Sequence, residues 1–398
     1  MKNLLTALLF VCCTLSAFCQ VYTLSGIIKD NDQKPIPMVG VFTKTGQGTF
    51  TNELGEFILK VSAVPAKITM SHLSYQAIEI EVANEKPVTI VLEESIKTLP
   101  EAKVGNYAFE LLKKSIQKIK GDSIYNFFGK GFYRKIQKEG DKYTVLHEMF
   151  FNANMNGRTG MTTWQPTESR YTNHDGNVSN DNTFVWPLML SRLSPRIYFI
   201  LNDELIEIKD YTKHYVFEIE SFYNENTPDE VAVVVCTPKK PFETDFAGRF
   251  YIKTSNGSML NIKGRHSTTT KGWTHNFWFK IKEAYLDVNV NFREQDEVSI
   301  PLGVDLDYVL MVQYASSVNR KIVDSMKLIM YDYSPAKNGE EKTLKESLMG
   351  EENIFATTQA SPEFWENNAI IKRTPVEDGI IKIFEGRKKK GGTMFPKK

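Results

Sequence analysis

Short runs of alternating apolar and polar residues fill the first quarter of the chain and restrict its fold more than any other feature. Seven such runs lie within Val21–Glu94, separated by turn residues. In the run EFILKV, every second side chain is apolar, whereas Glu56 and Lys60 would face water. Strands of parallel nucleotide-binding sheets are buried on both faces, so this pattern excludes them. The spacing predicts a small antiparallel β-sandwich.

The first residues, MKNLLTALLFVCCTLSAFCQ, have the build of a secretory signal peptide. Lys2 precedes an apolar run, and small residues come before Gln20. We expect cleavage after Cys19; in the alternative Cys19 is lipidated, although the bulky Phe18 before it is unfavourable for that modification. The run is shorter than the roughly 20 residues that cross a bilayer, and no later segment is long enough. The expected location is the periplasm or the outer membrane.

Charge and cysteine content narrow the possible partners. The chain has 49 basic and 48 acidic residues, and residues 387–398 hold six of the bases, which is typical of a solvated tail. This balance argues against a nucleic-acid partner, which requires a basic face on a folded domain.

Three of the four cysteines lie in the signal peptide, which leaves Cys236 without a disulfide partner in the mature chain. Its position in VAVVVCT predicts a buried, inert thiol.

The rest of the chain predicts one helix, a second β-rich region and a helical end. After Pro100, apolar residues recur at helical spacing from Ala108 until Gly121. Longer alternating runs within Tyr125–Tyr333 predict a large antiparallel sheet, curved or partly closed, with a helical interruption at 184–193.

Two pairs, Ser361–Pro362 and Thr374–Pro375, are typical of helix starts. The expected order is a signal peptide (1–19), a β-sandwich (20–95), a linker with an amphipathic helix (96–122), a large antiparallel β domain (123–336), a closing segment with short helices (337–386) and a basic tail (387–398).

The sandwich region resembles the carboxypeptidase regulatory-like domain, a transthyretin-like fold that is common at the front of Gram-negative outer-membrane receptors and other envelope proteins. The features that carry the likeness are Gly26, Asp30, Pro35, Pro37, Gly48 to Thr51, Gly55, Phe57 and Tyr75. Asn52 and Ser74 depart from the usual Asp and Gly, which a turn tolerates. The remainder, through FYRKIQKEGDKYTVLHEMFF and PEFWENNAII, looks like a larger domain attached to this sandwich in envelope proteins without an established activity.

No catalytic or metal-binding pattern is complete in the sequence. A zinc carboxypeptidase site requires a His and a Glu three residues apart, and none of the six histidines has that neighbour. His147–Glu148 begins like a zincin motif, but Phe151 takes the place of the second His. Lys34 occupies a ligand position of a possible calcium loop at 30–35. Serine and cysteine hydrolase patterns are also incomplete, so we expect no enzyme activity, metal or cofactor.

Aromatic side chains of the β-rich region are the best candidates for a binding surface. They are Trp164, Trp186, Trp273, Phe277 and Phe279. In a curved sheet such residues can line an apolar cavity or form a platform for sugar rings, or they can simply be core. Gly55, in TNELGEF, is the expected turn residue with a positive φ.

The sequence favours an exported, non-enzymatic cell-envelope protein that acts as an interaction or structural module. Two alternatives are a carrier or sensor of a lipid-like ligand in the β domain, and an accessory protein of a receptor or hydrolase system. The expected partner is another envelope protein or the membrane surface.

Overall fold

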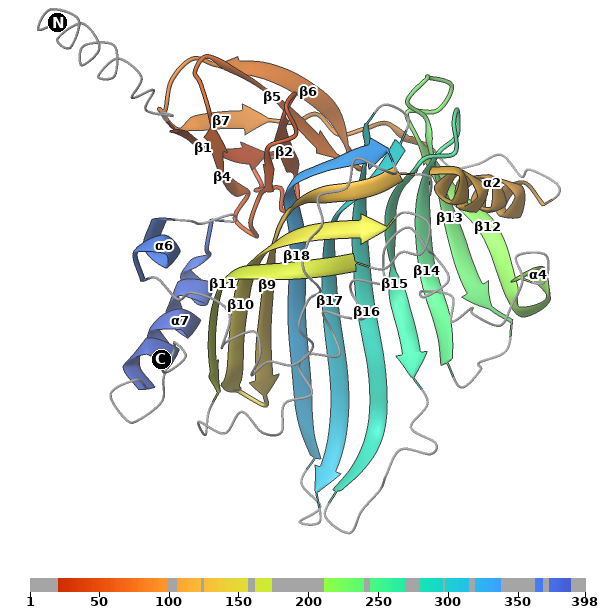
Figure 1. The fold of residues 1–398 in the computed structure, drawn as a ribbon. Helices are drawn as coiled ribbons and strands as arrows, with labels where there is room; N and C mark the ends of the chain where they lie inside the picture. The colour runs from red at the N-terminus through yellow and green to blue at the C-terminus, as the bar shows by residue number, and fades with distance from the viewer. Residues whose placement is uncertain are drawn as a thin grey trace, which may run out of the picture.

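The structure is a computed structural model, shown as a ribbon in Figure 1. It describes residues 21–98, 106–122, 125–156, 162–173, 211–239, 244–268, 279–295, 298–314, 319–337, 362–367 and 372–387. The helix expected at 184–193, the predicted signal peptide (1–19) and residues 388–398 lie outside these ranges. Within them, no helix has both the length and the apolar character required to cross a membrane.

The N-terminal region is a β-sandwich of a three-stranded and a four-stranded sheet, which confirms the predicted fold class. The first sheet has the order β4 (Glu56–Val61), β1 (Tyr22–Lys29), β7 (Val88–Val91), and the second has the order β3 (Gly48–Phe50), β2 (Gly40–Thr43), β5 (Ala66–His72), β6 (Tyr75–Val82). One pairing differs from the expectation, because β7 runs parallel to β1. The chain changes sheets between β6 and β7, so no hairpin forces the two neighbours to be antiparallel.

The turn before β4 is built by Asn52 and Gly55. The Asn52 side-chain oxygen accepts hydrogen bonds from the backbone N–H groups of Leu54 and Glu56, both at 2.9 Å. The Gly55 carbonyl accepts a bond of 2.8 Å from the Ile28 N–H, which joins the turn to β1. Gly55 has a φ of +70°, in the left-handed region that a side chain disfavours.

Strands between residues 97 and 337 form an 11-stranded sheet in which every neighbouring pair is antiparallel. Its order is β11 (Thr162–Asn173), β10 (Lys142–Asn156), β9 (Tyr125–Glu139), β18 (Asn319–Lys337), β17 (Val298–Tyr314), β16 (Phe279–Gln295), β15 (Met259–Thr268), β14 (Thr244–Lys253), β13 (Val231–Pro238), β12 (Tyr215–Tyr223), β8 (Lys97–Thr98). The last strand, β18, lies beside the first long strand, β9. The short helix α4 (Tyr211–His214) precedes β12.

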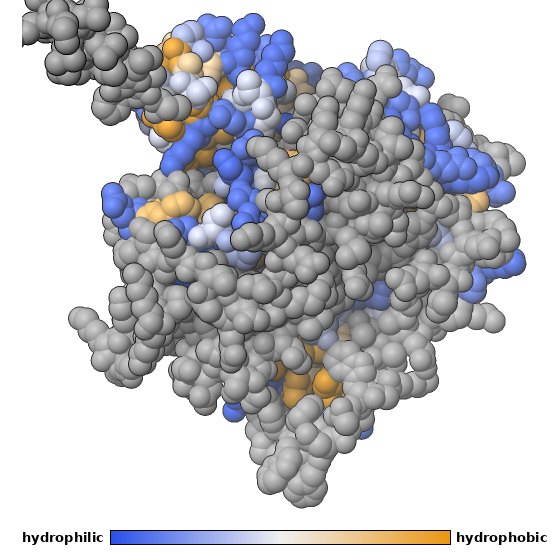
Figure 2. All heavy atoms as spheres, in the orientation of Figure 1, coloured by the Kyte–Doolittle hydropathy of each residue, from blue (hydrophilic) through white to orange (hydrophobic). Residues whose placement is uncertain are grey.

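The two faces of this sheet have different surroundings. The inner face carries Tyr133 and Phe250 and contacts the helix α2 (Tyr107–Asp122), whose Leu112 and Ile116 are buried against it. The outer face carries the residues that alternate with these along each strand, such as Phe132, which precedes Tyr133 on β9. Where α2 lies in Figure 1, Figure 2 shows mainly hydrophilic residues at the surface. The predicted amphipathic helix is therefore confirmed, with its apolar side on the sheet.

Two glycines allow an aromatic ring to lie against the backbone of the inner face. Gly248 on β14 and Gly264 on β15 are directly opposite each other. A Cβ atom at Gly248 or Gly264 would lie 2.5 or 2.6 Å, respectively, from the ring atom Cζ of Phe246. Only glycine at both positions leaves room for this ring.

Two C-terminal helices, α6 (Pro362–Asn367) and α7 (Pro375–Arg387), lie on the outer face of β9 to β11, as Figure 1 shows. The predicted cap of α7 is confirmed: the Glu377 N–H donates to Thr374 Oγ1 at 3.2 Å, and the Thr374 N–H donates to the Glu377 carboxylate at 2.8 Å. This reciprocal pair is a capping box. Ile380 and Ile381 of α7 pack on Leu146 of β10.

Candidate functional site

The aromatic residues proposed from the sequence are only partly covered by the structure. Trp186, Trp273 and Phe277 lie outside the described residues. The backbone of Trp164 pairs with that of Ala153 across β11 and β10, and that of Phe279 pairs with Tyr314 across β16 and β17. Their side chains are not among those described, so the aromatic surface stays a prediction.

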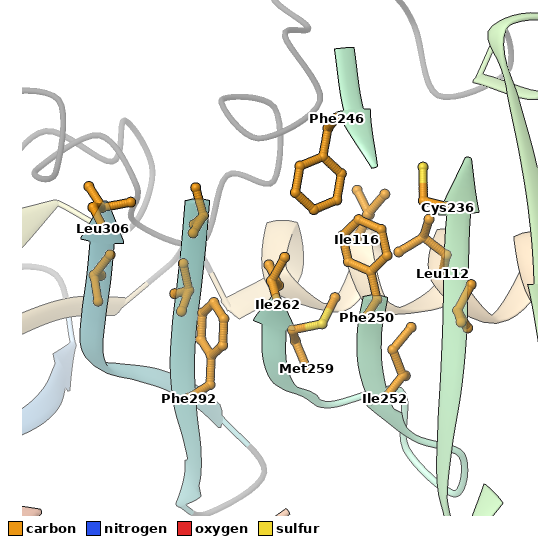
Figure 3. Close-up of a cluster of buried hydrophobic side chains, with 14 of the residues drawn as sticks. Leu112, Ile116, Cys236, Phe246, Phe250, Ile252, Met259, Ile262, Phe292 and Leu306 are labelled. Atoms are coloured by element: carbon orange, nitrogen blue, oxygen red, sulfur yellow. The ribbon is translucent and has the colours of Figure 1, made fainter. Parts of the chain in front are cut away.

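The inner face is a continuous apolar surface that extends over most strands of the large sheet. Figure 3 shows side chains from neighbouring strands directed toward α2. They include Leu112, Ile116, Cys236, Phe246, Phe250, Ile252, Met259, Ile262, Phe292 and Leu306, all of which are buried. Cys236 belongs to this core, and burial raises the pKa of its thiol well above the ordinary range. The predicted burial of this thiol is thus confirmed.

One group of polar residues interrupts the apolar inner face, at the end formed by β9, β10 and β18. The Lys135 ammonium lies 3.4 Å from the Asp324 carboxylate, and the Lys135 side chain is only 2% exposed. The Gln137 amide donates to the other Asp324 oxygen at 2.9 Å and accepts a bond of 2.8 Å from the Thr144 hydroxyl. We call Lys135, Asp324, Gln137 and Thr144 the inner polar group.

Two ionisable rings beside the inner polar group are kept neutral. Burial, together with the Lys135 charge, lowers the pKa of His147 to about 3. The His147 ring lies edge-on to Tyr133, with 5.5 Å between the ring centroids. Burial and the Asp324 carboxylate raise the pKa of Tyr308 to about 12. At neutral pH the charges of this region are therefore those of the ion pair.

The outer face holds a second charged cluster, made by Arg134, Glu148, Arg170 and Glu377, which we call the outer ion cluster. Arg134, Glu148 and Arg170 are directly opposite one another on β9, β10 and β11. The Nε atoms of Arg134 and Arg170 donate to separate Glu148 oxygens at 2.6 and 2.5 Å. Arg134 also donates to Glu377 at 2.5 Å, and Arg170 stacks 4.5 Å from the Trp365 ring centroid. Two guanidinium groups thus share two carboxylates.

Charge attraction outweighs burial in the outer ion cluster. Burial alone would raise the pKa of Glu148, but the charges of Arg134 and Arg170 lower it to about 2. Burial likewise opposes the charge on Arg134, and the carboxylates of Glu148 and Glu377 nevertheless raise its pKa. Glu148 and Arg134 are therefore held in their charged forms.

We predict an acid-sensitive contribution of Glu148 to stability. Its folded-state pKa of about 2 lies below the ordinary 4.5, so its contribution is complete above about pH 4.5 and is lost as pH falls toward 2. The depression corresponds to about 3 kcal/mol. Urea unfolding between pH 7 and 2.5 should show this loss. In Glu148→Gln the free energy of unfolding should fall less steeply as the pH is lowered. If the free energy of unfolding depended on pH in the same way in both proteins, Glu148 would not make this contribution.

The structure explains why the zincin-like pair does not form a site. His147 and Glu148 are consecutive on β10, so they point to opposite faces of the sheet, one beside Lys135 and the other between two arginines. Among the described residues, no three His, Cys, Asp or Glu side chains are grouped as they would be around a metal ion.

Comparisons with known proteins give little for the chain as a whole. No curated protein sequence matches it. The MucA/MucB complex of Pseudomonas aeruginosa is 8% identical and aligns with 57% of this chain and 98% of its own, with a TM-score of 0.19. A LolA superfamily protein from Nitrosomonas europaea is 10% identical, with coverages of 62% and 98% and a TM-score of 0.23. Similarities this faint carry no argument about fold or function.

The N-terminal region gives a clear result. The family model of the CarboxypepD_reg-like domain matches residues 24–104. This range begins inside β1, at Leu24, and includes all the other strands of the sandwich. Residues 24–104 thus contain a carboxypeptidase regulatory-like domain, a non-catalytic module, placed ahead of the large β domain.

Proposed function

We propose that the chain is an exported, non-catalytic protein of the cell envelope that acts as a structural or interaction module. The observation that carries this proposal is the buried junction between the sandwich and the outer face of the large sheet. Phe42 and Phe50 of the sandwich pack with Leu302 and Ile329 of the sheet, and all four are nearly inaccessible. A mobile tether would leave these side chains in water, so the junction favours a fixed orientation of the two parts.

Polar contacts surround this junction and support the same orientation. The Arg293 guanidinium lies 4.8 Å from the Phe42 ring centroid. On the C-terminal side, the Lys372 ammonium lies 2.7 Å from Glu56, and the Lys372 carbonyl accepts a bond of 3.0 Å from the Asn52 amide. The segment before α7 therefore contacts the sandwich, while α7 itself contacts the sheet.

A complementation experiment tests the structural role. In a strain lacking the gene, we expect increased sensitivity to detergent, which the wild-type chain and Cys236→Ala should restore to normal. Phe50→Asp should not restore it, because a carboxylate cannot be buried against Leu302 and Ile329. Phe50→Leu is the matched control and should complement. Full complementation by Phe50→Asp would contradict the proposal, and recovery of the mature protein in the cytoplasm would contradict the envelope location.

The inner face favours a second candidate function, a carrier or sensor of a lipid-like ligand. A ligand site of that kind is a mostly apolar surface with a few convergent polar groups, and the inner face combines an extended apolar surface with one polar group. Native mass spectrometry of the chain purified without detergent should show an added mass that solvent extraction removes. A spectrum with the protein mass alone would argue against a carrier.

A further inference from the structure

Helix α7 is held on the large sheet in one orientation, so one of its sides faces away from the protein. The capping box described above fixes its start. Ile380 and Ile381 are buried against Leu146 of β10, and the Glu377 carboxylate accepts a hydrogen bond from Arg134. Figure 1 shows α7 at one border of the molecule. The residues on its remaining side are therefore available to a partner.

The side of α7 that faces away carries an apolar stripe. Val376 and Ile383 are 64% and 46% exposed, and they lie two turns apart on the same side of the helix. A single exposed apolar side chain is ordinary on a protein surface. Val376, Gly379 and Ile383, however, follow the spacing i, i+3, i+7 of a helix face that packs against another element. We call these three residues the α7 stripe.

Gly379, in the middle of the α7 stripe, allows another backbone to come close. A Cβ atom at this position would meet no atom of the described residues within 4 Å, so none of their contacts requires a glycine here. A glycine inside an exposed stretch of helix lowers stability relative to alanine. Two helices approach most closely where the residues at their contact are small. The α7 stripe thus has an apolar side chain on each side of a point suited to close approach.

The charges beside the α7 stripe favour a second copy of this chain in antiparallel orientation. Asp378 and Lys382 lie one turn apart on the same flank of the helix. Asp378 is half exposed, although Arg373 lies 3.6 Å away. A two-fold axis through the middle of the stripe brings Asp378 of each copy beside Lys382 of the other. The same axis brings Val376 beside Ile383, whereas a parallel pair would place like charges together.

We infer that the α7 stripe is the contact surface of a weak homodimer, in which α7 of one copy packs antiparallel on α7 of a second copy. This inference rests on the proposed interaction role and names one partner for it. The stripe extends over only about 10 Å of helix, so the interface is smaller than that of a permanent dimer. A reversible equilibrium between monomer and dimer, with a dissociation constant in the micromolar range, is the expected state.

Sedimentation equilibrium of the purified protein at several concentrations tests the contact. Val376→Asp should raise the dissociation constant about tenfold or more, because the two-fold axis buries two carboxylates against apolar side chains. Val376 is mostly exposed in a single copy, so its replacement should leave the melting temperature of the monomer unchanged. Val216→Asp is the matched control. Val216 is 40% exposed on β12, and its replacement should leave the association unchanged.

A charge reversal tests the antiparallel orientation. Lys382→Glu should weaken the dimer, because two pairs of like charges then meet across the interface. The double variant Lys382→Glu/Asp378→Lys restores opposite charges at both places and should recover most of the wild-type affinity. Recovery by a second reversal cannot come from damage to α7 itself.

Three results would overturn the inference. A wild-type protein that stays monomeric at every concentration would overturn the homodimer, and complementation by the Phe50 variants would still test the structural role by itself. A dimer that tolerates Val376→Asp would overturn the α7 stripe as its contact surface. Failure of the double reversal to strengthen the dimer formed by Lys382→Glu would overturn the antiparallel pairing.

Discussion

Replacing Glu148 with glutamine is expected to lower the free energy of unfolding by about 3–5 kcal/mol, because one partner of a buried ion cluster is lost while the others stay buried. Arg134 and Arg170 have side chains only 7% and 5% exposed, and they would face each other across a neutral amide. Guanidinium chloride unfolding, followed by fluorescence, measures the change.

An exposed ion pair on the same sheet provides the control for this experiment. Arg249 and Glu220 lie 2.7 Å apart, with side chains 47% and 33% exposed. Glu220→Gln should cost no more than about 1 kcal/mol, because water screens the pair. If the two variants lost similar stability, the outer ion cluster would not have the energetic role that its burial indicates.

Gly55→Val is expected to destabilise the sandwich by about 3 kcal/mol or more, because a β-branched residue would be forced into the left-handed region in a crowded turn. The added Cβ would lie 2.4 Å from the Ile28 carbonyl oxygen, which is backbone and cannot rotate away. The same carbonyl accepts a hydrogen bond from the Ile36 N–H, so a shift would disturb the pairing beside β1. Thermal unfolding of the purified protein measures the loss.

Gly46 separates the two causes of this effect. It lies in the same domain with a φ of +94°, and a Cβ there would meet no atom within 4 Å. Gly46→Ala should therefore show the conformational strain alone, about 1–2 kcal/mol. Equal losses at both glycines would mean that the contact with Ile28 contributes nothing.

Local patterns in the sequence were sufficient for many of the elements and for some of their boundaries. The helix α2 followed from the spacing of residues such as Leu112 and Ile116, and the start of α7 followed from Thr374 and Pro375. Each of these signals acts within a few residues, where backbone geometry and capping determine the structure. The alternating strands gave the fold class for the same reason.

The pairing of distant segments was not predictable in this way. Nothing local to β9 and β18 indicates that they are neighbours, since their pairing depends on how the whole sheet closes. Arg134, Glu148 and Arg170 come from three strands, and only their joint burial makes them a unit. One signal was present but missed. Phe132 lies two positions before Arg134 and Phe150 lies two positions after Glu148, so each charged residue shares a strand face with a buried aromatic ring. A charge in that pattern indicates a buried partner.

The place of Glu377 in the outer ion cluster links α7 to the charge balance on the outer face of the large sheet. Arg134 also has Lys327 opposite it on β18, so without Glu377 its surroundings carry an excess of positive charge. During synthesis the sheet strands come first, and the two arginines have one carboxylate between them until α7 arrives. A chain cut short before Glu377 would keep an unbalanced charge under an uncovered apolar surface. We expect such a chain to open more readily and to be cut sooner by proteases than the wild type.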